Sequence, residues 1–211
     1  MLELTSQPLV LLISAPSGGG KTTVCERLLA AAPGLDRAIT CTTRPPRAGE
    51  RDGVDYHFLT AAAFAHSLAT AAFLEHASVY GYQYGTPREE LDRRLRAGRD
   101  VLLNVDVQGA ANVRAQAAQA DALRQALVTL FLTPPSLEVL AERLQRRGQD
   151  APEVIARRLE AARQEIAQWR QFDYLVISTT VEEDLRRVQG IYAAEKQRTS
   201  RLGEGPRPKV L

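Results

Sequence analysis

The segment Ser14-Ala-Pro-Ser-Gly-Gly-Gly-Lys-Thr-Thr23 limits what this chain can fold into more than any other part of the sequence. It follows a continuous apolar run at residues 9–13, which is typical of a strand buried on both faces, and it precedes a predicted helix over 24–32. Glycines between a strand and a helix let backbone N–H groups converge on phosphate oxygens. The pattern therefore predicts a phosphate-binding loop, with Ala15 standing where the usual pattern has its first glycine.

Lys21 and Thr22 supply the polar side chains that such a loop requires. The Lys21 ammonium would reach the terminal phosphates of a nucleotide, and the Thr22 hydroxyl would coordinate Mg²⁺. No further lysine occurs before Lys196, so the chain lacks the N-K-x-D type of motif with which GTPases read guanine. This argues against a lysine-dependent GTP switch and leaves NTPases and small-molecule kinases open.

Beyond the loop, short apolar runs alternate with helical patterns. Further buried strands are predicted over 101–105, 127–132 and 174–177, and helices over 109–119, 137–147, 153–169 and 181–198. Because this alternation implies a parallel sheet, we expect an α/β fold of three layers, with helices on both faces of the sheet. Residues 40–97 carry short strands and the densest aromatic cluster, and they are predicted to be an insertion between core elements.

Composition narrows the class of protein further. The 211 residues carry a net charge of only +2, which excludes a strongly basic nucleic-acid arm, and the sequence has no basic–aromatic stripe. No apolar run approaches the ~18–20 residues of a membrane span, and no basic leader precedes a long apolar stretch. The two cysteines, Cys25 and Cys41, are too few for a disulfide framework, and they have neither zinc spacing nor a C-x-x-C arrangement. We therefore expect a cytoplasmic protein with free thiols that binds neither membranes nor nucleic acid.

A second anion site is predicted around Arg44 and Arg47, in a loop that the neighbouring prolines stiffen. Two guanidinium groups held in this way can grip a phosphate through paired hydrogen bonds, although two solvated surface arginines would give the same pattern. Glu75 and Asp106 are carboxylates at predicted strand ends. A carboxylate can accept the adjacent N1–H and N2–H donors of guanine, which adenine lacks. This favours guanine, although many buried carboxylates are paired only structurally.

A third group of arginines flanks a predicted break near residues 148–152. Arg143 and Arg147 lie four residues apart on a predicted helix and share one face, and Arg157 and Arg158 follow the break. Helices that carry arginines around a flexible turn could close over transferring phosphates, offset the developing charge and exclude water. Ordinary surface ion pairs would explain any one of these arginines equally well.

Taken together, these segments resemble guanylate kinase, a P-loop nucleoside monophosphate kinase that moves a phosphoryl group from ATP to GMP. The most specific matches are the phosphate-binding loop and Thr42-Thr-Arg-Pro-Pro-Arg-Ala-Gly-Glu50. Four shorter motifs follow in the family's order and spacing: Asp55-Tyr-His-Phe58, Phe73-Leu-Glu-His-Ala77, Tyr84-Gly-Thr86 and Val105-Asp-Val-Gln-Gly109. The resemblance covers residues 10–194, nearly the whole chain.

The glycines and prolines near the end of the sequence predict a flexible tail of residues 201–211. The resemblance implies a P-loop core of residues 1–39, 98–135 and 169–200, a GMP-binding subdomain of residues 40–97 and a helical lid of residues 136–168. It implies catalytic roles for Lys21, Arg44, Arg147 and Arg158, with Arg143 as a helper. ATP would be bound by Ser14, Ala15, Pro16, Ser17, Gly18, Gly19, Gly20, Lys21, Thr22 and Thr23. GMP would be bound by Thr40, Arg44, Arg47, Tyr56, Glu75, Tyr84, Gly85, Thr86 and Asp106. The expected cofactor is Mg²⁺, held by Thr22 and the substrate phosphates.

Two departures from the family pattern leave alternatives open. Asn104 stands where family members often carry an acidic residue, so the surroundings of guanine and Mg²⁺ would lose one negative charge. Ser178-Thr179 stands where the family often has Asn-Asp, which puts in doubt any contact of this stretch with the donor base. A sister kinase for another phosphorylated acceptor, such as a ribose bisphosphate, and a binding module without catalysis remain the alternatives. The choice between monomer and homo-oligomer stays undecided.

Overall fold

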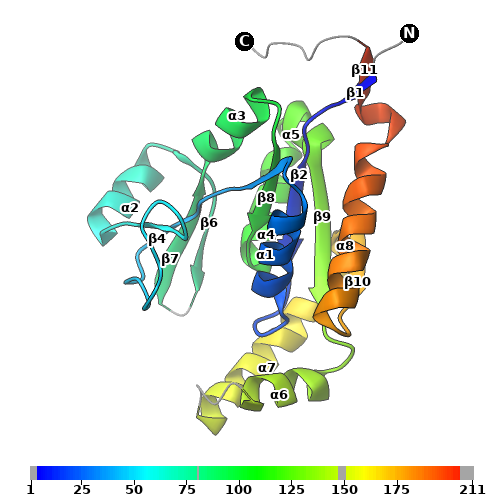
Figure 1. Ribbon diagram of the computed structural model, residues 1–211. Helices are drawn as coiled ribbons and strands as arrows, with labels where there is room; N and C mark the ends of the chain where they lie inside the picture. The colour runs from blue at the N-terminus through cyan, green and yellow to red at the C-terminus, as the bar shows by residue number, and fades with distance from the viewer. Residues whose placement is uncertain (1–3, 80, 147–150, 205–211) are drawn as a thin grey trace.

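A five-stranded parallel sheet forms the centre of the molecule in a computed structural model that describes residues 4–79, 81–146 and 151–204 (Figure 1). The strands lie in the order β10-β9-β2-β8-β3, and each neighbouring pair is parallel. The predicted α/β fold with a parallel sheet is thus confirmed. The strands are β2 (Val10–Ser14), β3 (Leu35–Arg37), β8 (Asp100–Asn104), β9 (Leu127–Thr133) and β10 (Tyr174–Ile177).

Helices cover both faces of this sheet because successive strand residues point to opposite sides. Along β2, Leu11 and Ile13 belong to one apolar cluster, whereas Val10 and Leu12 belong to another. All four side chains are fully buried, and each contributes about 2 kcal/mol of hydrophobic free energy. The first cluster is covered by α1 (Lys21–Ala31) and α8 (Val181–Lys196), and the second by α3 (Arg88–Arg96), α4 (Val107–Ala117) and α5 (Asp121–Ala126).

A second, smaller sheet lies to one side of the core, within the predicted insertion (Figure 1). The ring of Phe64 lies 4.6 Å from that of Phe73, between centroids, and closes a small apolar cluster with Cys41. Leu91 of α3 packs in the main core, so by packing the inserted part ends near Pro87 rather than at residue 97. The elements are β4 (Cys41–Thr42), β5 (His57–Phe58), α2 (Ala61–Ala69), β6 (Phe73–Val79) and β7 (Tyr82–Pro87), in the strand order β5-β4-β7-β6.

A helical hairpin of α6 (Leu137–Arg146) and α7 (Pro152–Ile166) stands below the carboxyl ends of the core strands (Figure 1). It has its own apolar cluster, in which Leu140, Leu144 and Ala162 are fully buried. A 3-10 turn, η1 (Trp169–Gln171), returns the chain from α7 to β10. None of the helices in the described ranges combines the length and the apolar character needed to span a membrane.

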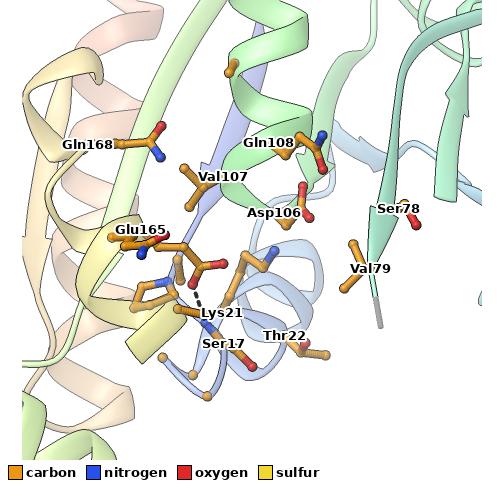
Figure 2. A pocket seen from close by; sticks show the side chains of 18 of the residues that line it. Ser17, Lys21, Thr22, Ser78, Val79, Asp106, Val107, Gln108, Glu165 and Gln168 are labelled. Atoms are coloured by element: carbon orange, nitrogen blue, oxygen red, sulfur yellow. Dashed lines mark hydrogen bonds between the residues drawn. The ribbon is translucent and has the colours of Figure 1, made fainter. Parts of the chain in front are cut away.

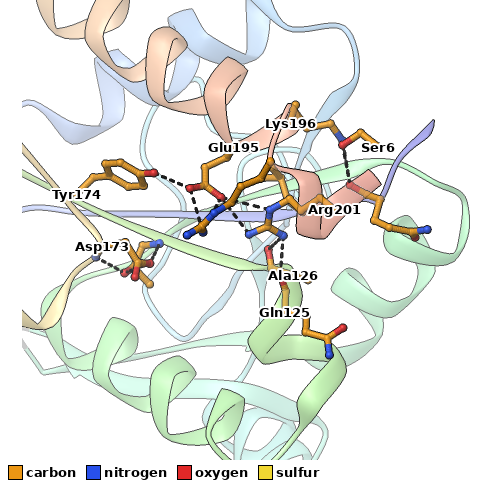
Figure 3. A network of polar contacts seen from close by, with 12 residues as sticks. Ser6, Gln125, Ala126, Asp173, Tyr174, Glu195, Lys196 and Arg201 are labelled. Atoms are coloured by element: carbon orange, nitrogen blue, oxygen red, sulfur yellow. Dashed lines mark hydrogen bonds and ion pairs between the residues drawn. The ribbon is translucent and has the colours of Figure 1, made fainter. Parts of the chain in front are cut away.

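Residues 201–204 form ordered structure, which corrects the start of the predicted flexible tail at residue 201. A short turn, η2 (Thr199–Arg201), leads into β11 (Leu202–Glu204), which pairs with β1 (Leu4–Ser6) in antiparallel fashion. The buried Arg201 side chain explains this order (Figure 3). Its Nη2 lies 3.2 Å from Glu195 Oε2, and its Nη1 donates to the Gln125 carbonyl at 2.6 Å. Residues 205–211 lie outside the described part of the chain.

Replacing Arg201 with alanine is expected to lower the free energy of unfolding by about 3 kcal/mol, because it leaves the buried Glu195 carboxylate without this cation. Urea denaturation followed by circular dichroism measures the effect. The matched control is Arg198→Ala, since the Arg198 side chain pairs with the same carboxylate but is 62% exposed. Equal losses in the two variants would contradict the assignment of the stabilising role to the buried pair.

Candidate active site

The predicted phosphate-binding loop lies between β2 and α1, at the carboxyl edge of the sheet. Gly18 and Gly20 have φ angles of 86° and 92°, a region that favours glycine, and Gly20 forms the N-cap of α1. Residues 15–23 line a cavity of 650 Å³, within the range of small-molecule sites, which we call the cradle pocket. Ser14 does not line it, because it is fully buried at the end of β2.

Lys21 begins α1 and points across the cradle pocket toward the end of β8 (Figure 2). Its Nζ donates a hydrogen bond to the Val105 carbonyl at 2.5 Å. Burial lowers the pKa of Lys21, while the fields of nearby groups, including the Asp106 and Glu165 carboxylates, act in the opposite direction. Anionic phosphates in the cradle pocket could draw the Lys21 ammonium away from the Val105 carbonyl.

A second cavity adjoins the first and gathers most of the predicted acceptor residues. It measures 310 Å³, and we call it the arginine pocket. Lys21, Thr22 and Asp106 line both cavities, so the two pockets share a wall. Besides those three residues, the lining of the arginine pocket includes Thr40, Arg44, Arg47, Tyr56, Glu75, Tyr84, Asn104 and Arg158. Residues from the small sheet, the core and the lid thus converge on one space.

Arg44 is held rigidly in this pocket, whereas Arg47 is exposed. The Arg44 guanidinium donates to Glu50 Oε1 at 2.8 Å and to the Pro45 carbonyl at 2.7 Å. It also lies 5.5 Å from the centre of the Tyr56 ring. The Glu50 hydrogen bond raises the pKa of Arg44, so the group stays cationic. Its Nε is buried and has no acceptor among the described residues.

Glu75 is the most deeply buried carboxylate of the arginine pocket, with 4% of the residue exposed. Its Oε1 accepts hydrogen bonds from the Thr86 backbone N–H at 3.1 Å and from the Thr86 hydroxyl at 2.6 Å. Burial raises the pKa of Glu75 to about 7, against the opposing effect of these hydrogen bonds. Thr86 therefore orients Glu75 instead of lining the pocket, and Gly85 lies buried with its α-carbon against the Phe73 ring.

The predicted lid arginines Arg143 and Arg158 line different cavities. Arg143 donates to Ser178 Oγ at 3.2 Å and to the Thr179 carbonyl at 3.4 Å, in a third cavity beside Gly18 and Gly20. The Ser178 hydroxyl itself donates to Asp184 at 2.6 Å, so it is committed within the protein. Arg158 lines the arginine pocket. Arg147 lies outside the described residues.

Glu165 was missed by reasoning from the sequence. This lid residue lines the cradle pocket, and its Oε2 accepts a hydrogen bond from the Ser17 backbone N–H at 3.1 Å (Figure 2). The sequence does contain a weak indication of this role. Glu165 lies seven residues after Arg158, and residues two turns apart share one face of a helix. An isolated glutamate on a charged helix has no motif of its own, however.

The oxygen atoms that line the cradle pocket are of a kind that could bind Mg²⁺, the expected cofactor. No group of three or more His, Cys, Asp or Glu side chains that could hold a metal occurs in the ranges the structure describes. The exposed Thr22 hydroxyl and the Asp106 carboxylate do line the cavity that holds the loop. Such oxygen donors suit Mg²⁺, which usually binds through one or two protein groups together with phosphates and water.

Comparison with known proteins decides which family has this arrangement. The sequence profile described as guanylate kinase matches residues 6–195. The chain belongs to the guanylate kinase family. It is 44% identical to the guanylate kinase of Paramagnetospirillum magneticum over 92% of this chain and 87% of that protein. It is 48% identical to the guanylate kinase of Neisseria meningitidis serogroup A, over 92% of each chain.

The fold agrees with this family assignment. The crystal structure of guanylate kinase from Anaplasma phagocytophilum matches with a TM-score of 0.75 and 32% identity, covering 94% of this chain and 92% of that one. Membership of the guanylate kinase family makes this chain a nucleoside monophosphate kinase.

Proposed function

We propose that this guanylate kinase family member transfers the γ-phosphoryl group of Mg·ATP to GMP, giving ADP and GDP. The observation that carries the proposal is the wall shared by the cradle pocket and the arginine pocket, to which Lys21, Thr22 and Asp106 contribute. Phosphates held in the cradle and a phosphate held by Arg44 would meet at this wall. Such positioning is the main requirement of phosphoryl transfer.

The acceptor would lie in the arginine pocket, with its base toward Glu75. The ionised Glu75 carboxylate can accept both the N1–H and the N2–H of guanine, while Thr86 holds its other side. Arg44, Tyr56 and Tyr84 line the same pocket and can hold the GMP phosphate. A phosphate oxygen would then attack the γ-phosphorus in line, and the bond to the β–γ bridging oxygen would break as ADP departs.

The positive charges around the transfer point come from different parts of the fold. Lys21 leads α1, Arg44 comes from the small sheet, and Arg158 comes from the lid. Together they can offset the charge spread over the transferring group. Mg²⁺, held by Thr22 and the donor phosphates, would further neutralise that charge. No protein nucleophile is required.

The decisive experiment measures ADP release from Mg·ATP with GMP, AMP, UMP, a ribose bisphosphate or no acceptor. ADP release that requires GMP supports the proposal. Release with another acceptor alone would replace it with the sister-kinase reading, and Asn104 would be the first residue to test. GMP binding without any release would favour a binding module.

The KM for GMP is expected to fall about tenfold as the pH rises from 6 to 8. The pKa of Glu75 is raised to about 7, chiefly by burial, so the carboxyl is mostly protonated at pH 6 and mostly ionised at pH 8. Only the ionised form can accept both guanine donors. Steady-state kinetics across this range measure the effect. Because the GMP phosphate also titrates near pH 6, the control is Glu75→Gln, in which only the contribution of the phosphate should remain.

Replacing Arg44 with alanine is expected to raise the KM for GMP about thirtyfold, since it removes a charged hydrogen-bond donor to the acceptor phosphate. The KM for ATP should change little. Arg51→Ala is the matched control, because Arg51 is an exposed arginine of the same loop. An unchanged KM and kcat for GMP in Arg44→Ala would return Arg44 to a structural role with Glu50.

A further inference from the structure

The lid touches the phosphate-binding loop at two consecutive residues. At Gly18, an added Cβ would lie 2.8 Å from Leu144 Cδ2 and 3.2 Å from Leu140 Cδ1, so α6 packs directly on the loop backbone. At Ser17, the backbone N–H donates to Glu165 Oε2 of α7 at 3.1 Å. The first contact is apolar and the second is a charge-assisted hydrogen bond. Helix α6 therefore contacts the loop through apolar side chains, and α7 contacts it through a hydrogen bond.

Helix α7 connects this hydrogen bond to the arginine pocket. Glu165 lines the cradle pocket, and Arg158, seven residues earlier, lines the arginine pocket. Seven residues are two turns, so the side chains share one face and lie about 10 Å apart along the axis. A shift of the α7 axis at Glu165 would therefore carry Arg158 with it.

The two ends of α7 are supported differently. Ile155 and Leu159, in its first half, pack in the small cluster of the lid, against Leu140 and Leu144. Ile166, beside Glu165, packs against the core cluster that contains Val10 and Leu12. The Glu165 hydrogen bond thus lies where the helix leaves the core and becomes part of the lid. Figure 2 shows the carboxylate lying between the loop and the end of α7.

We propose that Glu165 is a positioning residue that latches α7 to the phosphate-binding loop through Ser17 and thereby places Arg158 over the transferring phosphate. The acceptor oxygen is what the latch requires, because the partner is a backbone N–H. Burial raises the pKa of Glu165, in keeping with a carboxylate enclosed between two elements. The kinetic part of this inference rests on the proposed phosphoryl transfer to GMP, whereas the latch itself exists in the free protein.

Hydrogen exchange measured by mass spectrometry on the nucleotide-free full chain tests the latch without any reaction. Wild type is compared with Glu165→Ala, Glu165→Gln and Glu160→Ala, the last being an exposed glutamate of the same helix. We expect Glu165→Ala to raise exchange several-fold in peptides that contain Ser17 and α7, and the other two variants to match wild type. Unchanged exchange in Glu165→Ala would overturn the latch, whatever the enzyme's substrate proves to be.

A double-mutant cycle with Arg158→Ala tests the consequence for transfer. Glu165→Ala should lower kcat by about ten- to a hundredfold, as a displacement of about 1 Å does, with little change in the KM for GMP. Glu165→Gln should stay within about threefold of wild type, because the amide oxygen can still accept the Ser17 N–H. In the Arg158→Ala background, Glu165→Ala should cost less than about twofold, since coupled residues are not additive.

Three results would overturn the kinetic role. Losses that multiply in the double variant would show that Glu165 does not act through Arg158. A loss in Glu165→Gln equal to that in Glu165→Ala would show that the charge, and not the acceptor oxygen, matters. A lower KM for ATP with unchanged kcat in Glu165→Ala would show that the carboxylate merely occupies the cradle. If wild type itself releases no ADP with GMP, the proposed function fails, and the exchange experiment alone decides the latch.

Discussion

Replacing Lys21 with alanine is expected to lower the kcat for GMP-dependent ADP release by about a thousandfold, the scale on which loss of a preorganised charge at a transfer site acts. Within the described part of the chain, the Lys21 ammonium donates a hydrogen bond to the Val105 carbonyl, and Lys21 lies at the wall shared by both pockets. It is therefore free to follow the phosphates through the reaction. A coupled assay of ADP release under saturating Mg·ATP and GMP measures the effect.

The fold should survive this substitution, which separates a catalytic loss from a structural one. We expect the free energy of unfolding to change by less than about 1 kcal/mol, because one hydrogen bond is removed. Arg27→Ala is the matched control, since Arg27 lies on the exposed side of the same helix and pairs with Glu182. Turnover of Lys21→Ala close to that of Arg27→Ala would contradict the assignment of the loop.

Glu75→Gln is expected to lower kcat/KM for GMP by about a hundredfold, equivalent to about 2.7 kcal/mol of transition-state binding. The reason lies in the orientation that Thr86 imposes. Its backbone N–H and hydroxyl both lie against Oε1 of Glu75, so the glutamine carbonyl would take that side. The amide NH₂ would then face the N–H donors of guanine, and donor would oppose donor.

The ratio of GMP to AMP activity is the measurement that isolates base reading. It should fall in Glu75→Gln, because adenine offers no adjacent donor pair to lose. Glu89→Gln provides the same chemical change at an exposed position of α3. A ratio that stays fixed in Glu75→Gln would show that Glu75 does not contact the base.

The features that the sequence predicted best are the local ones. The phosphate-binding loop could be placed because its strand, glycines and helix start are contiguous over about twenty residues. Arg44, Glu75 and Asp106 could be named as polar residues of interest, but their convergence came only from resemblance to a family. The hydrophobic periodicity of a sequence does not predict how a small sheet packs against the core. For these residues a ligand-binding role remains a prediction.

Other features depend on contacts between distant residues. The pairing of Leu4 with Glu204 joins two short segments at opposite ends of the chain, and their local composition suggests a loop. Glu165 lies 148 residues after Ser17, and a backbone N–H leaves no trace in the sequence of its partner. Tertiary contacts of this kind decide local structure without a local signal.

Gly18 packs closely on Leu140 and Leu144, so this one position must satisfy two structural requirements. Its left-handed backbone shapes the loop, and its missing side chain leaves room for the lid. The Cβ of an alanine at this position would clash with Leu144 and push the lid away from the loop. A binding assay would show weaker nucleotide binding, and hydrogen exchange would show looser packing of the α6–α7 hairpin. Position 18 therefore sets how closely the lid can pack on the loop, as well as the shape of the loop itself.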